Sequence, residues 1–116
     1  TKQRVDLAKL IFSKKQHFTA ADLISTADRK NLNISMATIY NTLSLLETKG
    51  MLETINIEND LKFYDTNLDN HHHLYNTTMS TLTDIDHDQV VFSDFPELPK
   101  NLQIESTEVL IKVKNK

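Results

Sequence analysis

The chain has 116 residues, a formal net charge of −3, 39% hydrophobic residues and 25% charged residues, an ordinary composition for a soluble globular protein. Its length fits one compact domain or two very small ones. Cysteine is absent, which excludes disulfides, thiolate metal sites and thiol catalysis. The apolar runs are too short to span a membrane and the N-terminus does not resemble a signal peptide, so we expect a cytoplasmic protein with no membrane partner.

Charge is distributed unevenly along the chain. Up to Ile55 there are 8 Lys and Arg residues against 5 Asp and Glu residues, whereas beyond Ile55 there are 5 against 11. A mildly basic front half followed by an acidic back half indicates either two halves with different tasks or solvated faces without a partner. Charge alone leaves both interpretations open.

The first half begins with two predicted helices. Apolar residues recur with helical spacing from Arg4 to Phe12. Thr19, followed three residues later by Asp22, is typical of a helix N-terminus, because the hydroxyl can cap the helix and the acid is favoured by its dipole. A second helix is therefore predicted from Ala20 to about Arg29.

A third helix is predicted from its N-cap Ser35 to about Thr48, and the only glycine, Gly50, follows where a C-terminal cap needs a positive φ. Its apolar stripe consists of Met36, Ile39, Leu43 and Leu46. The opposite face carries small polar residues, with a tyrosine at the border: Thr38, Asn41, Thr42 and Tyr40. Such side chains can approach base edges, and a Tyr ring can contact a thymine methyl. Taken alone, the pattern also fits a plain amphipathic helix with a solvated face.

Two strands are predicted after the third helix. Leu52 to Ile57 and Leu61 to Tyr64 flank the turn-prone tripeptide Glu58-Asn59-Asp60. Three helices followed by a β-hairpin is the order of a winged helix-turn-helix, in which the last helix enters the major groove and the hairpin forms the wing. We therefore predict an α+β fold whose N-terminal winged-helix DNA-binding domain spans residues 1–64.

The second half is predicted to contain only short strands. They are expected at His71 to Tyr75, Leu82 to Ile85, Val90 to Phe92 and Ile104 to Val113. Pro96 and Pro99 exclude a regular helix interior, so Phe95 to Leu102 should form a loop or a single turn. A sheet this small buries little apolar surface alone, and sharing it with a second copy is the expected remedy. The prediction is a hinge at 65–70 and a mostly β dimerisation and metal-sensing domain at 71–116.

Imidazoles and carboxylates gather around the predicted hinge. On a strand, His71 and His73 point to one face and His72 to the other. Asp65 precedes them by a short connector, and a hairpin can bring Asp84 alongside. Neutral imidazole nitrogen and carboxylate oxygen together suit a divalent first-row metal, so the cluster predicts metal or haem binding. Taken alone, the pair of histidines also fits a polar, solvent-facing strand end.

The other two histidines carry no such prediction by themselves. His87 lies in an acidic stretch that is typical of a solvated turn, and His17 precedes a helix cap, where a structural role is expected.

The order of several motifs resembles that of the ferric uptake regulator (Fur) family over nearly the whole chain. In the front half the motifs are Thr1-Lys2-Gln3-Arg4, His17-Phe18-Thr19-Ala20, Ala37-Thr38-Ile39-Tyr40, Leu43 with Leu45-Leu46, and Gly50. The match continues in order with Phe63-Tyr64-Asp65, His71-His72-His73 and Asp84-Ile85. The back half looks most like the iron response regulator (Irr) branch, through Leu74-Tyr75, Leu98-Pro99 and the ending Glu108 to Lys114.

This resemblance implies roles for individual residues. The counterparts of the family's regulatory metal ligands are His17, Asp65, His71, His73 and Asp84. The candidate DNA-contacting residues are Arg4, Ser35, Thr38, Tyr40, Asn41 and Lys62. The resemblance also implies double-stranded DNA and a second copy of the chain as partners. The Irr branch implies haem as a signal, with the triplet His71, His72 and His73 as its site.

The chain departs from the family's pattern in three places. Asn76 and Met79 stand where the first pair of zinc-binding cysteines would be, so no structural zinc site built from four cysteines is expected. A helix of the dimerisation domain is replaced by the proline-bearing stretch Phe95 to Leu102. Asn41 stands where many relatives have Arg, which puts one charged DNA contact in doubt.

We therefore predict a homodimeric, metal- or haem-responsive transcriptional regulator of iron or haem homeostasis that binds a palindromic operator. Three imidazoles with two carboxylates favour Fe²⁺ or Mn²⁺ over tetrahedral Zn²⁺, which is left as an option in vitro. The alternatives are a metal-dependent enzyme that uses the same cluster, and a metal or haem carrier without DNA binding. An enzyme is not expected, because a chain with one glycine and a cramped sheet offers little room for a substrate pocket. Whether the regulator represses or activates stays open.

Overall fold

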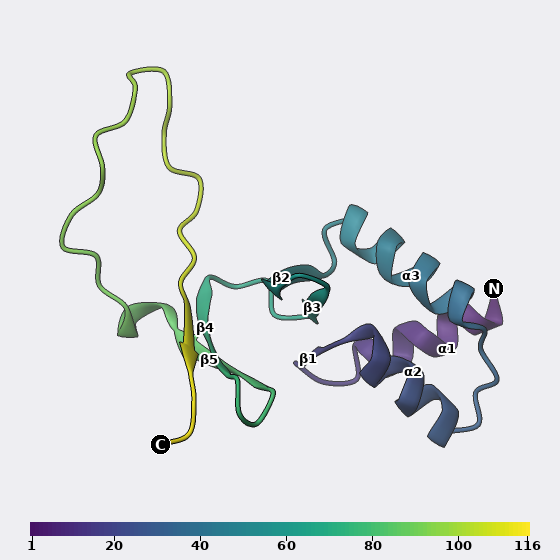
Figure 1. Cartoon of the computed structure of the whole chain (residues 1–116). Helices are drawn as coiled ribbons and strands as arrows, with labels where there is room; N and C mark the ends of the chain where they lie inside the picture. Colours follow the sequence, from purple (N-terminus) through teal and green to yellow (C-terminus); the bar gives the residue numbers. More distant parts are fainter. The chain divides into compact units, whose positions relative to one another are not determined.

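The computed structural model describes all 116 residues, which form two compact units, Thr1–Leu68 and Asp69–Lys116 (Figure 1). Helices are confined to the first unit, apart from one 3-10 turn, and both units contain a small sheet. The α+β fold class predicted from the sequence is confirmed. No helix is both long enough and apolar enough to cross a membrane.

The first unit contains three helices and a three-stranded antiparallel sheet. The helices are α1 (Lys2–Ile11), α2 (Ala20–Arg29) and α3 (Met36–Thr48), and the strands are β1 (His17–Phe18), β2 (Glu53–Glu58) and β3 (Leu61–Asp65). The strand order is β1-β3-β2. The three helices and the β2–β3 hairpin follow the predicted winged-helix order, whereas β1 was not predicted, because two residues carry no periodic pattern.

Local capping residues fix where the helices begin and end. Thr19 and Asp22 form a capping box at α2, in which each side chain binds the other residue's backbone N–H, at 3.1 and 3.0 Å. The Ser35 hydroxyl accepts a hydrogen bond from the Thr38 N–H at the start of α3. Gly50 has a φ of 73°, the left-handed conformation that glycine adopts without strain.

One hydrophobic core holds the first unit together. It is formed by buried residues from all three helices, from β1 and β3, and from the segment before β2: Leu7, Ile11, Phe18, Leu23, Ala27, Ile39, Leu43, Leu46, Leu52 and Tyr64. Burying a Leu or Ile side chain contributes about 1.5–3 kcal/mol, so this cluster is the main source of the unit's stability.

Two details of α3 differ from the prediction. Met36, in its first turn, is 59% exposed, whereas Thr42 is buried, and its hydroxyl is satisfied by donating to the Thr38 carbonyl, 2.7 Å away.

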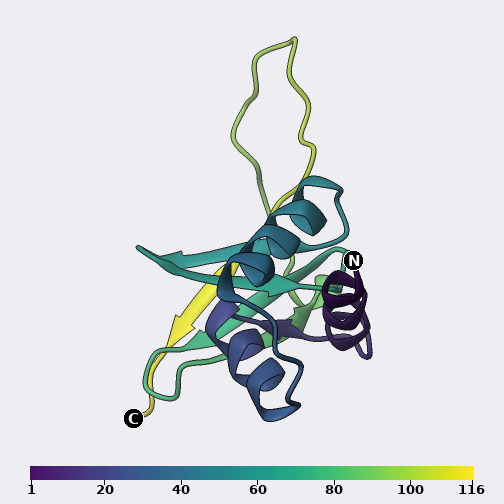
Figure 2. The same cartoon turned by 90° about the vertical axis from the view of Figure 1, so that its right-hand side faces the viewer.

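The β2–β3 hairpin is tied to α3 by one acidic side chain. Glu47, near the C-terminal end of α3, accepts a hydrogen bond from the Thr54 hydroxyl of β2 at 3.3 Å and pairs with Lys62 of β3 at 3.2 Å. In Figure 2 the two strands form a ribbon beside α3. The helix and the hairpin of the winged-helix order are therefore linked directly to each other.

The second unit is built on a three-stranded sheet in the order β5-β4-β6. Its elements are β4 (His71–Asn76), β5 (Thr81–Asp86), the 3-10 turn η1 (His87–Gln89) and β6 (Leu110–Val113). β5 pairs antiparallel with β4 through a tight hairpin, and β6 returns to pair parallel with the other edge of β4. Between η1 and β6 the chain makes a long excursion without helix or strand, visible as the green-to-yellow loop in Figures 1 and 2.

Two strand predictions in this unit were wrong, and one loop prediction was confirmed. Val90 to Phe92 is not a strand, and of Ile104 to Val113 only the last four residues are strand. A segment with alternating apolar residues forms a strand only where a neighbouring strand can hydrogen-bond with its backbone. β4 pairs with this segment only from His73 to Asn76, so only Leu110 to Val113 form β6. Phe95 to Leu102 is a loop with one turn, in which the Leu102 N–H donates to the Pro99 carbonyl.

Candidate metal centre

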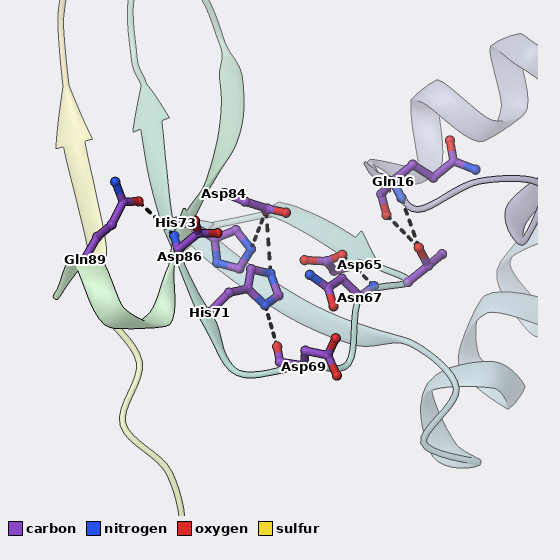
Figure 3. A network of polar contacts seen from close by, with 10 residues as sticks. Gln16, Asp65, Asn67, Asp69, His71, His73, Asp84, Asp86 and Gln89 are labelled. Atoms are coloured by element: carbon purple, nitrogen blue, oxygen red, sulfur yellow. Dashed lines mark hydrogen bonds and ion pairs between the residues drawn. The ribbon is translucent and has the colours of Figure 1, made fainter.

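Three of the predicted ligands converge in the β4–β5 hairpin of the second unit. His73 lies directly across from Asp84 in the strand register, and His71 lies two residues earlier on the same face of β4. The Nε2 atoms of His71 and His73 are 3.6 and 3.5 Å from the same carboxylate oxygen, Oδ1 of Asp84. Figure 3 shows both rings pointing toward this carboxylate.

A backbone contact determines which ring nitrogen of His71 carries the hydrogen. Its Nδ1 lies 2.6 Å from the carbonyl oxygen of Asp69, and a carbonyl can only accept, so Nδ1 carries the hydrogen (Figure 3). The lone pair is then on Nε2, the atom that faces Asp84. Ligating histidines commonly donate their second ring nitrogen in this way, which fixes both the tautomer and the ring orientation.

The spacing of these three side chains suits a metal ion. Each offers one ligand atom, and these atoms lie within 4.8 Å of one another. Metal–ligand bonds of about 2.1 Å place neighbouring ligand atoms about 3.0–3.4 Å apart, close to the observed 3.5 and 3.6 Å. The Asp84 side chain is 42% exposed, which leaves an approach from solvent. Two neutral imidazoles and one carboxylate form a set that divalent first-row metals accept.

The remaining two predicted ligands lie opposite each other in the first unit. β1 pairs with β3 so that His17 is directly across from Asp65. The His17 ring contacts Phe63 edge-on at 6.3 Å, and one oxygen of Asp65 accepts from the Asn67 N–H at 2.9 Å. The first unit therefore places two of the five predicted ligands opposite each other, and the second unit brings the other three together.

The sequence did not reveal what fixes the chain next to Asp65. Gln16 and Thr66 bind each other through three hydrogen bonds, including Thr66 N–H to the Gln16 carbonyl at 3.1 Å. The Gln16 side-chain amide also donates to the carbonyls of Leu10 and Ile11 at the end of α1, at 3.2 and 2.7 Å. Because the contacts between Gln16 and Thr66 join residues 50 positions apart, no local pattern could have indicated them.

The predicted haem triplet is divided between two faces of β4. His71 and His73 face Asp84, whereas His72 alternates to the other face and is buried, with 2% of its surface exposed. His72 is therefore not part of the three-residue cluster.

Several candidate DNA-contacting residues lie close together on the first unit. Arg4, Thr38 and Asn41 line one shallow depression of about 460 Å³, which the N-terminal part of α1 and the first half of α3 enclose. Tyr40 is 49% exposed and does not belong to the hydrophobic core. A basic residue, small polar side chains and an exposed aromatic ring are thus available at the α3 surface.

Two further candidates for DNA contact have local structural roles. The Ser35 hydroxyl donates to Thr38 Oγ1 at 2.9 Å while it caps α3. Lys62 pairs with Glu47 and lies over the Tyr64 ring, 5.1 Å from its centroid. Burial acts to lower the pKa of Lys62, but the hydrogen bond to Glu47 and the nearby Tyr64 and Glu47 groups outweigh it and raise the pKa above its ordinary value.

The chain is similar in sequence to known bacterial regulators. The ferric uptake regulation protein of Synechococcus elongatus is 35% identical over 78 residues, which are 66% of this chain and 53% of that protein. The peroxide-responsive repressor PerR of Staphylococcus epidermidis is 28% identical over 90 residues, which are 78% of this chain and 60% of that protein. The chain thus spans about half the length of the curated relatives it matches.

Solved structures share the fold. A ferric uptake regulator from Francisella tularensis with iron superposes with a TM-score of 0.80 at 21% identity, covering 100% of this chain and 90% of that one. A ferric uptake regulator from Pseudomonas aeruginosa with manganese gives a TM-score of 0.73 at 17% identity, covering 100% and 89%. The sequence model of the Ferric uptake regulator family matches residues 1–112. This chain belongs to the ferric uptake regulator family.

Proposed function

We propose that this protein is a transcriptional regulator that binds DNA in response to a divalent metal ion held in part by His71, His73 and Asp84. The observation that carries the proposal is the convergence of two imidazole Nε2 atoms on one carboxylate oxygen, at 3.6 and 3.5 Å. Family membership favours a regulator over an enzyme, and its relatives are named as a regulation protein and a repressor.

The complete ligand set, in this proposal, includes His17 and Asp65 from the first unit. These two residues lie opposite each other in the β1–β3 pair, and only five residues separate Asp65 from His71. Three imidazoles and two carboxylates give five donors, more than tetrahedral Zn²⁺ requires, and favour Fe²⁺ or Mn²⁺. The similar structures described with iron and with manganese are in line with this choice.

The DNA-reading surface would be the exposed face of α3 together with the start of α1. Tyr40, Asn41, Thr38 and Arg4 supply an aromatic ring, an amide, a hydroxyl and a guanidinium, which suit thymine methyls, base edges and phosphates. Ser35 and Lys62 would act there mainly by shaping α3 and the hairpin, because both are engaged in contacts within the unit.

Metal binding and DNA binding would be coupled through the separation of two recognition helices in a homodimer. Residues 71–116 comprise a small sheet and a long loop, and exposed apolar residues, most of them in the loop, offer a surface that a second copy can cover. A palindromic operator requires recognition helices about one helical turn of DNA apart. Ligands drawn from both units would restrict how each DNA-binding unit is held relative to its sheet, so metal affinity and DNA affinity become linked.

The resemblance to the Irr branch adds haem as an alternative effector in this proposal. The geometry of β4 favours a metal ion instead, because two histidines of the triplet face Asp84 and the third is buried on the opposite face. A haem site would therefore use His71 or His73 rather than all three residues. A carrier without DNA binding is disfavoured by the exposed Tyr40 of α3 and by Arg4, which lies with Thr38 and Asn41 of the same helix.

The test is a DNA-binding titration with a palindromic site selected from random duplexes by the wild-type protein with Mn²⁺. Affinity is measured without metal, with Mn²⁺ and with haem. We expect Mn²⁺ to change the affinity at least about fivefold, the usual lower range of coupling between two sites. His71→Ala should abolish the metal response and keep the basal affinity.

Two controls separate the metal role from the DNA role. Tyr40→Ala should weaken operator binding by about 1–3 kcal/mol, the worth of a good base contact, with metal content unchanged. Loss of metal in Tyr40→Ala, or an identical affinity in all three conditions for the wild type, would contradict the proposal. Light scattering of the wild type, alone and on the operator, checks for two copies per site.

A further inference from the structure

His72 sits between two candidate metal ligands on β4 but belongs to a different set of contacts. Its ring stacks on His87 at 5.9 Å with an interplanar angle of 19°, and it meets Phe92 edge-on at 6.2 Å. With only 2% of its surface exposed, it is one of the most deeply buried side chains of the chain. The proposed metal function leaves this buried imidazole without a role.

A single backbone group explains the position of the His72 ring. The Val109 N–H donates to His72 Nδ1 at 3.0 Å. A ring nitrogen that accepts a hydrogen bond carries no proton, so His72 is the neutral tautomer with its hydrogen on Nε2. The Val109 carbonyl, in turn, accepts from the backbone N–H of His73 at 3.1 Å. Val109 is therefore held at two points by adjacent residues of β4.

These contacts close the base of the long loop that runs from β5 to β6. His87 and Phe92 lie on the outgoing arm of the loop, and Val109 lies on its return, immediately before β6. Figure 1 shows the loop leaving and rejoining the sheet at neighbouring points. Ordering a loop of this length costs conformational entropy, and apart from the short 3-10 turn η1 its own residues supply no helix or strand to offset the cost. One imidazole contacts both arms.

We propose that His72 is a positioning residue that links occupancy of the His71–His73–Asp84 site to closure of the loop and pairing of β6. The proposal rests on the metal-binding function proposed above. His71 and His73 flank His72 directly, so fixing their rings restricts the β4 backbone that carries the His72 ring. The His73 N–H that holds the Val109 carbonyl belongs to the same restricted segment. A bound ion would thereby favour the conformation in which Val109 is held at both points.

The test uses Zn²⁺, a diamagnetic divalent ion, and amide hydrogen exchange of the full chain measured by NMR. In the wild type, saturating Zn²⁺ should slow exchange of the Val109 amide at least about fivefold, the lower range of coupling between two sites. His72→Phe keeps a buried ring but removes the acceptor, so Val109 should exchange about tenfold faster, as for the loss of one hydrogen bond. By linkage, this variant should also bind Zn²⁺ more weakly, by about the factor by which Zn²⁺ slows exchange of Val109 in the wild type.

Two matched variants separate the acceptor from the ring. His72→Asn offers an amide oxygen near the position of Nδ1 and should restore part of the Val109 protection. His87→Ala removes the stacking partner, leaves the acceptor in place and should leave the zinc-dependent protection of Val109 intact.

Each outcome decides one of the two proposals. If the wild type binds Zn²⁺ but Val109 protection does not change, the link through His72 is wrong and the metal site stands. If His72→Phe responds to Zn²⁺ as the wild type does, the link is equally refuted. Failure of the wild type to bind Zn²⁺ would overturn both proposals. The wild-type titration alone decides the link if His72→Phe does not fold.

Discussion

The two units differ in the number of apolar side chains that they bury in a core of their own. In the first unit a continuous cluster of buried residues joins all three helices to the sheet. In the second unit the buried residues are only His72, His73, Tyr75 and Leu82, whereas eight large apolar residues are exposed: Met79, Val91, Phe92, Phe95, Leu98, Leu102, Ile104 and Ile111. The first unit has an apolar core of its own, whereas the second is held mainly by strand pairing and polar contacts.

The largest expected effect comes from removing a core side chain of the first unit. Leu43 is fully buried, so Leu43→Ala should lower the free energy of unfolding by about 2–5 kcal/mol through lost burial and a cavity. The matched change in the second unit, Leu82→Ala, removes a side chain with few buried neighbours and should cost about 2 kcal/mol or less. Urea unfolding followed by helical circular dichroism and by tyrosine fluorescence would measure both losses.

The comparison between the units fails if Leu82→Ala proves as costly as Leu43→Ala. Met36→Ala serves as the control, because this side chain is 59% exposed and its truncation should change stability by less than about 0.5 kcal/mol.

The second expected effect is stabilisation of the second unit by metal. A ligand at about 100 times its dissociation constant stabilises the native state by about 2.7 kcal/mol. Mn²⁺ should therefore raise the melting temperature of the wild type. Asp84→Asn keeps the shape of the side chain but removes the charge that faces both Nε2 atoms, so it should lose most of this rise. An equal rise in Asp84→Asn would show that the metal stabilises the protein elsewhere.

A third, smaller effect concerns the start of α3. Ser35→Ala removes the cap of the Thr38 N–H and should cost about 1 kcal/mol. Ser44→Ala, on an exposed face in the middle of the same helix, should be neutral or slightly stabilising because Ala has the higher helix propensity. Thermal melts of the two variants give the difference. Equal losses would mean that Ser35 acts through something other than capping.

The sequence predicted what depends on neighbouring residues. The capping box at Thr19, the cap at Ser35 and the positive φ of Gly50 all follow from residues within a few positions. The alternation of His71 and His73 on one face of a strand is equally local, and their convergence on Asp84 needed only a tight hairpin. The grouping of these three predicted ligands therefore follows from local sequence.

Contacts between distant residues were not predictable from the same patterns. β1 is two residues long and exists because Asp65 and Tyr64, far along the chain, pair with it. The Val109 N–H donates to His72, which lies 37 positions earlier in the chain. β6 ends at Val113, which pairs with Asn76, the last residue of β4. The helical pattern places Thr42 on the solvated face, because a pattern of residue types does not show that its hydroxyl bonds to its own helix backbone. In each case the decisive partner is set by the three-dimensional structure.

The smallest expected effect tests the link between α3 and the hairpin within the first unit. Lys62→Met keeps the aliphatic stem over Tyr64 but removes the ion pair with Glu47, and should cost less than about 1 kcal/mol at pH 7, since the pair is partly exposed. The folded-state pKa of Lys62 is raised above 10.5, so its contribution is present at neutral pH and is lost only as the pH rises through that higher value. Melting curves at pH 7 and 9 should therefore show the same small difference between variant and wild type. A loss above about 2 kcal/mol, well beyond the range of exposed ion pairs, would mean that this contact is central to the first unit rather than a peripheral contact beside its apolar core. A difference that already disappears at pH 9 would contradict the raised pKa of Lys62.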